Sequence, residues 1–69
     1  MKVFDQHVFD VGPAWAKYAT RNAWGDLSYW ADKPTLSACG LYFEGAGLHQ
    51  RGAIGFEQKN PRMIKRVSA

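Results

Sequence analysis

Residues 15–34, WAKYATRNAWGDLSYWADKP, decide the fold of this chain, because they have the pattern of a β-hairpin around one glycine. Apolar and polar residues alternate before and after that glycine, as they do in strands that bury one face. Asn22 and Gly25 tolerate the left-handed backbone conformation that hairpin turns need. The stretch also holds five of the chain's ten aromatic residues. We therefore predict two antiparallel strands on either side of residues 22–26.

A helix over residues 13–24 is the alternative for the first half of this stretch. Pro13 suits the first position of a helix, Gly25 suits the position after its last residue, and several alanines lie between them. The apolar stripe of such a helix is short, because the row that contains Tyr18 continues with the polar Asn22. The alternation favours the strand, and the helix stays open at this point.

The same stretch resembles segments of small, mostly uncharacterised proteins encoded by tailed phages and prophages. Those chains are short, aromatic-rich and cysteine-poor, and strands rich in Trp and Tyr flank a glycine turn in them. This chain departs from the pattern at Trp24, where a small or polar residue is expected beside the glycine. The resemblance implies a phage origin, an action inside the host cell and a hairpin. It assigns no functional residue.

The rest of the chain contributes shorter elements. Strands are predicted at residues 2–9, 41–44, 53–57 and 63–67, a connection or single helical turn at residues 35–38, and a glycine-rich connection at residues 45–52. The predicted fold class is mainly β, with a small α+β fold as the alternative. It consists of a single antiparallel sheet of about four to five strands with at most one short helix.

Length and cysteine content restrict the class of protein. Sixty-nine residues allow one domain, residues 1–69, and a single cysteine excludes an intramolecular disulfide. Small secreted domains usually depend on disulfides, so a cytoplasmic location is predicted. We expect no signal peptide, because Lys2, Asp5 and Asp10 interrupt the region that would have to be apolar. We expect no membrane partner, because no run approaches the roughly 18 apolar residues of a membrane span. A core this small is marginally stable, which leaves a homodimer as an open alternative.

The positive charge is concentrated near the C-terminus. Residues 51–69 hold five basic residues and one acidic residue, whereas residues 1–50 have a net charge of −1, which together give the overall +3. Lysine and arginine on an edge strand discourage its pairing with other chains. Residues 60–69 are therefore predicted to be a basic edge strand or tail.

Groups that could perform catalysis or bind a metal are few and poorly spaced. His7, His49 and Cys39 form no CxxC, HxxxH or HExxH pattern, so no metal and no cofactor is predicted. A lone cysteine is more often a small buried side chain than a nucleophile. The glycines of residues 45–52, with Arg51, favour a hairpin connection over a phosphate site. The chain is predicted not to be an enzyme.

Protein binding is the function that we favour from the sequence. Trp, Tyr and Arg anchor interfaces more often than other residues, and Trp24 lies at a probable loop tip, where a role in the core is hardest to arrange. The hypothesis is an accessory protein that binds a host or defence protein stoichiometrically and inhibits it. The predicted contact residues are Trp24, Trp30, Tyr42 and Arg51.

Two other functions stay open. One is a nucleic-acid-binding module, in which sheet aromatics stack on bases and basic side chains contact phosphates. Its residues on the sheet would be Trp15, Lys17, Trp30, Tyr42, Arg51 and Lys65, and its basic C-terminal residues Lys59, Arg62, Lys65 and Arg66. The other is a structural component of a virion that assembles with copies of itself.

Overall fold

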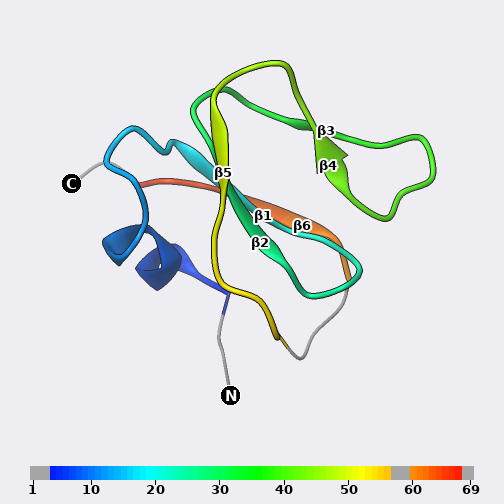
Figure 1. Ribbon diagram of the computed structural model, residues 1–69, viewed down its shortest axis with the longest axis horizontal. Coiled ribbons are helices and arrows are strands. Elements are labelled where there is room, and N and C mark those ends of the chain that lie inside the picture. Colours follow the sequence, from blue (N-terminus) through cyan, green and yellow to red (C-terminus); the bar gives the residue numbers. More distant parts are fainter. Residues whose placement is uncertain (1–3, 57–59, 68–69) are drawn as a thin grey trace.

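The computed structural model describes residues 4–56 and 60–67, and in these residues the fold is mainly β (Figure 1). A four-stranded antiparallel sheet has the order β5-β2-β1-β6, and a separate two-stranded sheet pairs β3 with β4. The elements in chain order are the 3-10 helix η1 (Gln6–Asp10), β1 (Tyr18–Arg21), β2 (Leu27–Trp30), β3 (Thr35–Leu36), β4 (Phe43–Glu44), β5 (His49–Arg51) and β6 (Arg62–Lys65). The predicted class is confirmed.

The predicted hairpin is formed by β1 and β2, with Tyr18 opposite Trp30 and Arg21 opposite Leu27. Its strands are shorter than the alternating pattern, because the chain bends between residues 13 and 16, where the Ala16 amide bonds the carbonyl of residue 13. The alternative helix over residues 13–24 is wrong. In that helix the polar Asn22 would have interrupted the apolar stripe and left little apolar surface to bury. As a strand, β1 pairs with β2 on one side and with β6 on the other.

The strand predicted at residues 2–9 is wrong in its described part. Val8 and Phe9 are adjacent in sequence, and both are buried in the same cluster on one face of the sheet, whereas successive side chains of a strand point to opposite faces. The 3-10 helix η1 turns both toward the sheet. Its start is fixed by Asp5, whose carboxylate accepts a hydrogen bond from the backbone N–H of His7 at 2.9 Å.

The main core lies between η1 and one face of the four-stranded sheet. Phe4 packs edge-on against Phe56 with ring centroids 6.0 Å apart, and the Tyr29 hydroxyl donates to the Val8 carbonyl at 2.5 Å. Burial raises the pKa of the Tyr29 hydroxyl, so the donor stays protonated. The buried cluster consists of Phe4, Val8, Phe9, Ala16, Ala19, Leu27, Tyr29 and Phe56.

A second, smaller buried layer covers the other face of the hairpin. Residues 31–48, which we call the arm, contain β3 and β4 and lie on the other side of the hairpin from η1 (Figure 1). Trp30 is only 6% exposed, and its Nε1 donates to the Thr20 hydroxyl at 3.0 Å. Pro34 is fully buried, and a Cβ at Gly45 would lie 3.3 Å from the Trp30 ring. Glycine at that position therefore lets the arm approach the ring closely.

The remaining strand predictions differ in their outcomes. Residues 63–67 were predicted as an edge strand, and β6 confirms this, with bounds that are one to two residues earlier. Of the strand predicted at residues 41–44, the second half forms β4. The connection at residues 35–38 instead begins with the short strand β3.

The predictions for residues 45–52 and 53–57 are wrong in the described part. Residues 49–51 form the edge strand β5, and residues 53–56 are not a strand. All three residues of β5 are exposed, so it has no apolar alternation to reveal it. After β5 the chain stays beside β2 through isolated backbone hydrogen bonds. One of them joins the Leu27 amide to the Ala53 carbonyl at 2.9 Å.

Candidate functional site

Trp24 projects from a turn that its neighbours fix tightly. The Asn22 side-chain oxygen accepts hydrogen bonds from the backbone N–H groups of Trp24 at 2.9 Å and Asp26 at 3.0 Å. Gly25 has a φ of 82°, and its carbonyl accepts from the Phe56 amide at 3.1 Å. The Trp24 side chain takes no part in these bonds and is 57% exposed. The turn is thus ordered, while its largest side chain faces solvent.

The tip of the arm lies beside this turn. The Leu41 carbonyl accepts a hydrogen bond from the Ala23 amide at 2.8 Å, and the ring centroids of Tyr42 and Trp24 are 6.5 Å apart. Tyr42 is 40% exposed and Leu41 is also exposed. We call Trp24, Leu41 and Tyr42 the aromatic patch. Leu41 was not singled out in the sequence, because it reaches Trp24 only through the folding of the arm.

Arg51 and Trp30, the other two predicted contact residues, have different positions. Arg51 is exposed on β5, and its Nη2 lies 3.6 Å from the Asp26 carboxylate at the end of the Trp24 turn. The fold therefore brings Arg51 to the side of the turn. Trp30 lies in the second buried layer and stacks on the His49 ring at 4.9 Å, so it presents no large surface to a partner.

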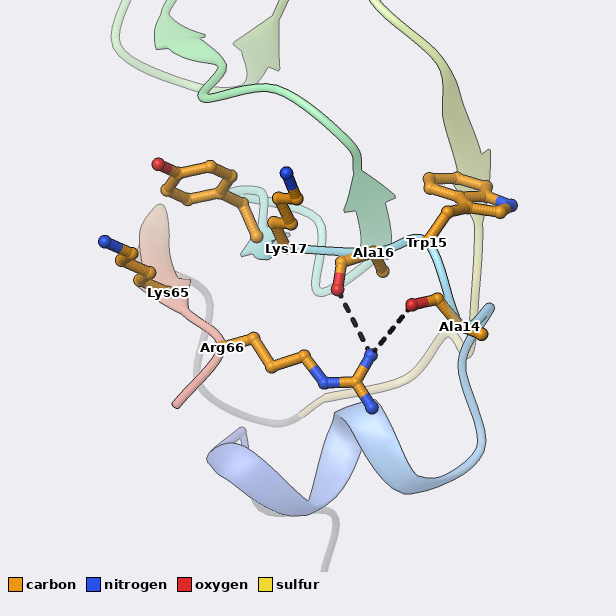
Figure 2. Close-up of a pocket in the computed structure, with 7 residues that line it drawn as sticks. Ala14, Trp15, Ala16, Lys17, Lys65 and Arg66 are labelled. Atoms are coloured by element: carbon orange, nitrogen blue, oxygen red, sulfur yellow. Dashed lines mark hydrogen bonds between the residues drawn. The ribbon is translucent and has the colours of Figure 1, made fainter. Parts of the chain in front are cut away.

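A groove opens at the opposite end of β1 (Figure 2). Its volume is about 680 Å³, and it is lined by residues 14–18 together with Lys65 and Arg66. The Arg66 Nη1 donates to the Ala14 and Ala16 carbonyls at 3.3 Å each, and the guanidinium lies 5.6 Å from the centre of the Phe9 ring. Figure 2 shows Lys17 and Lys65 extending away from this guanidinium.

The other predicted basic residues are dispersed. Arg62 is exposed on β6 opposite Arg21, and Lys59 lies outside the described residues. Arg21 is buried, and its Nε and Nη2 donate to the Asn60 carbonyl at 3.1 and 2.8 Å. Burial, and secondarily the charge of Arg62, lowers the pKa of Arg21. Of the described residues in the basic C-terminal set, Lys65 and Arg66 line the groove and Arg62 does not.

Cys39 is exposed, which corrects the expectation of a small buried side chain. It lies in the turn between β3 and β4, and it is not a member of the buried cluster. The Ser37 hydroxyl lies 3.2 Å from the Cys39 sulfur, and this hydrogen bond, followed by the backbone N–H of Leu41, lowers the pKa of the thiol. Among residues 4–56 and 60–67, no three His, Cys, Asp or Glu side chains gather in a metal-binding arrangement.

The glycine-rich residues 45–52 serve packing. A Cβ on Gly47 would lie 2.5 Å from the Asp32 carboxylate, so the loop places a negative charge beside its own backbone. Such a negative charge disfavours a bound anion beside Gly47. Within the described part of the chain, no helix is long and apolar enough to cross a membrane.

Comparison of the chain with protein-family models, with curated proteins and with solved structures found no match.

Proposed function

We propose that this chain is a non-enzymatic accessory protein that binds a partner protein stoichiometrically through the aromatic patch. The exposure of Trp24 supports this most directly. A tryptophan that keeps more than half of its surface in solvent gains little from folding, and burying it against a partner gains much. Tyr42 and Leu41 extend the same apolar surface.

The rigidity of the patch favours binding further. The Trp24 turn is held by Asn22, and the arm tip is held by the bond between Ala23 and Leu41. A surface that is already ordered loses little conformational entropy when a partner covers it, so more of the contact energy remains as affinity. The ion pair between Arg51 and Asp26 adds a polar margin beside the apolar centre, as interfaces commonly have.

The partner that we propose is a host or defence protein, which the chain inhibits when it binds. The resemblance of residues 15–34 to segments of tailed-phage proteins supports this choice of partner. The small size supports inhibition by occlusion, since a domain of 69 residues acts most simply by covering a surface of a larger protein.

The experiment starts with a tagged pull-down from nuclease-treated bacterial lysate, read by mass spectrometry, and continues with the affinity of the purified pair. Trp24→Ala is expected to weaken binding by more than about fivefold, because it removes the centre of the patch. Val11→Ala is the matched control, since Val11 is 87% exposed and lies outside the patch. Thermal melting verifies that each variant is folded.

Two results would contradict the proposal. One is an unchanged affinity of folded Trp24→Ala for the captured protein. The other is self-association of the purified chain, measured by sedimentation, that Trp24→Ala abolishes while no partner is retained. That second result would indicate the structural, self-assembling function instead.

A further inference from the structure

We infer a second binding surface: the groove at the start of β1 binds single-stranded nucleic acid, with Lys17 and Lys65 on two separate phosphates and Tyr18 stacked on a base. This surface is separate from the aromatic patch and does not depend on the protein-binding proposal. It also differs from a simple basic tail, because the fold brings Lys17 and Tyr18, at the start of the first strand, next to Lys65 from the last strand.

Every charged residue that the structure describes in the groove is basic. Lys17, Lys65 and Arg66 line it, and none of the described acidic residues does. Both salt bridges found among residues 4–56 and 60–67 lie elsewhere, at Asp5 and Asp26. Lys17 and Lys65 are exposed and have no salt bridge to any described residue, so their ammonium groups are available to an anionic ligand. Two such cations along one groove suit two phosphates of the same strand.

Arg66 acts in the groove as a positioning residue. The carbonyl oxygens of Ala14 and Ala16 would repel an anion, and the Arg66 Nη1 donates to both of them (Figure 2). Packing of the guanidinium on the Phe9 ring holds it in place. The wall of the groove therefore presents a neutralised backbone, while the lysines supply the cations that face the ligand.

Tyr18 supplies the contact that separates a single strand from a free phosphate. It lies directly opposite Lys65 in the β1–β6 pairing, so the two side chains share one face of the sheet. Tyr18 is only half-buried, which leaves part of its ring to the groove. A base stacks on an aromatic ring only when it is unstacked from its neighbours, and this condition favours single strands over a duplex.

The test is the anisotropy of a labelled single strand of mixed sequence, titrated with the full chain at several salt concentrations. Wild type is expected to bind at roughly 50 mM salt and to bind more weakly as salt rises. The slope of the logarithm of the binding constant against the logarithm of the salt concentration should be about −1.4 or steeper, from two phosphate contacts. The double variant Lys17→Gln/Lys65→Gln should lose about tenfold or more in affinity and flatten the slope by about 1.4. Lys33→Gln, an exposed lysine on the arm, is the matched control and should change neither.

Tyr18→Leu should weaken binding of the strand by roughly 5- to 100-fold while leaving the salt slope unchanged, because stacking releases no counterions. Melting curves identify any variant that has unfolded. If Tyr18→Leu is unfolded, Tyr18→Phe replaces it as the folded reference and is expected to bind like wild type. The inference is overturned if wild type does not bind at low salt, if Lys33→Gln weakens binding as much as the double variant, or if folded Tyr18→Leu binds as well as wild type. Equal binding of a duplex of the same sequence would also overturn it.

Discussion

Gly25→Ala tests whether contact with residue 56 fixes the turn that presents Trp24. Gly25 has a φ of 82°, where an alanine costs about 1–2 kcal/mol. Its added Cβ would also lie 2.5 Å from the Phe56 carbonyl oxygen, which is backbone and cannot move alone. Separating the two segments would lengthen the hydrogen bond from the Phe56 amide to the Gly25 carbonyl, for about another 1 kcal/mol. We expect a total loss of about 2–3 kcal/mol.

Gly40→Ala is the control that isolates the contact. Gly40 has a similar φ of 73°, but no atom lies within 4 Å of the Cβ that alanine would add. It should therefore lose only the conformational part, about 1–2 kcal/mol. A domain of this size has about 3–5 kcal/mol in total, so Gly25→Ala should be close to unfolding at room temperature.

The assay is urea unfolding followed by tryptophan fluorescence, with both variants compared at the same temperature. For 60–100 residues, about 1 kcal/mol corresponds to a melting-temperature shift of about 4–8 °C, so thermal melting provides a second reading. Equal losses in Gly25→Ala and Gly40→Ala would refute the reasoning. They would mean that the approach of Phe56 adds nothing to the stability of the turn.

Two further predictions concern single side-chain hydrogen bonds. Trp30→Phe removes the donor to the buried Thr20 hydroxyl and should lower the free energy of unfolding by about 1–3 kcal/mol without changing partner affinity. Adding Thr20→Val should restore part of this loss in urea unfolding, whereas a full, additive second loss would contradict the hydrogen bond. Ser37→Ala should raise the pKa of the Cys39 thiol, because the hydrogen bond from Ser37 that favours the thiolate is lost. The pH profile of iodoacetamide labelling should therefore move to higher pH, and an unmoved profile would contradict the role of Ser37.

The hairpin could be predicted because its information is local. The alternation on either side of Gly25 and the turn chemistry of Asn22 lie within a few residues of each other, and the strands pair with each other directly. The edge position of β6 was also predictable, since Lys65 and the neighbouring basic residues suit an edge.

The errors share a different cause, which is contact between distant segments. Val8 and Phe9 form a plausible strand pattern until the sheet beneath them requires both on one side. Nothing in the residues of β5 identifies a strand, because only its pairing with β2 makes it one. Trp30 was assigned to an interface for the same reason: the sequence does not reveal that the arm folds back over it.

The two buried layers explain how so small a chain can leave aromatic rings at its surface. One sheet is covered on both faces, by η1 on one and by the arm on the other, so each buried ring packs against a layer that the sheet already provides. Five rings suffice for this burial, and they belong to Phe4, Phe9, Tyr29, Trp30 and Phe56. Trp24 and Tyr42 are thereby released from the core.

The placement of the two proposed surfaces follows from the same arrangement. The aromatic patch lies beyond the end of β1, after Arg21, and the groove lies at its beginning, at Tyr18. The three strand residues after Tyr18 separate them by about 10 Å, so a ligand on one surface does not have to displace a ligand on the other. Trp24→Ala should then leave binding of the single strand intact, and Lys17→Gln/Lys65→Gln should leave binding of the protein partner intact. Each variant thus reports on its own surface, and loss of both activities in one folded variant would contradict their separation.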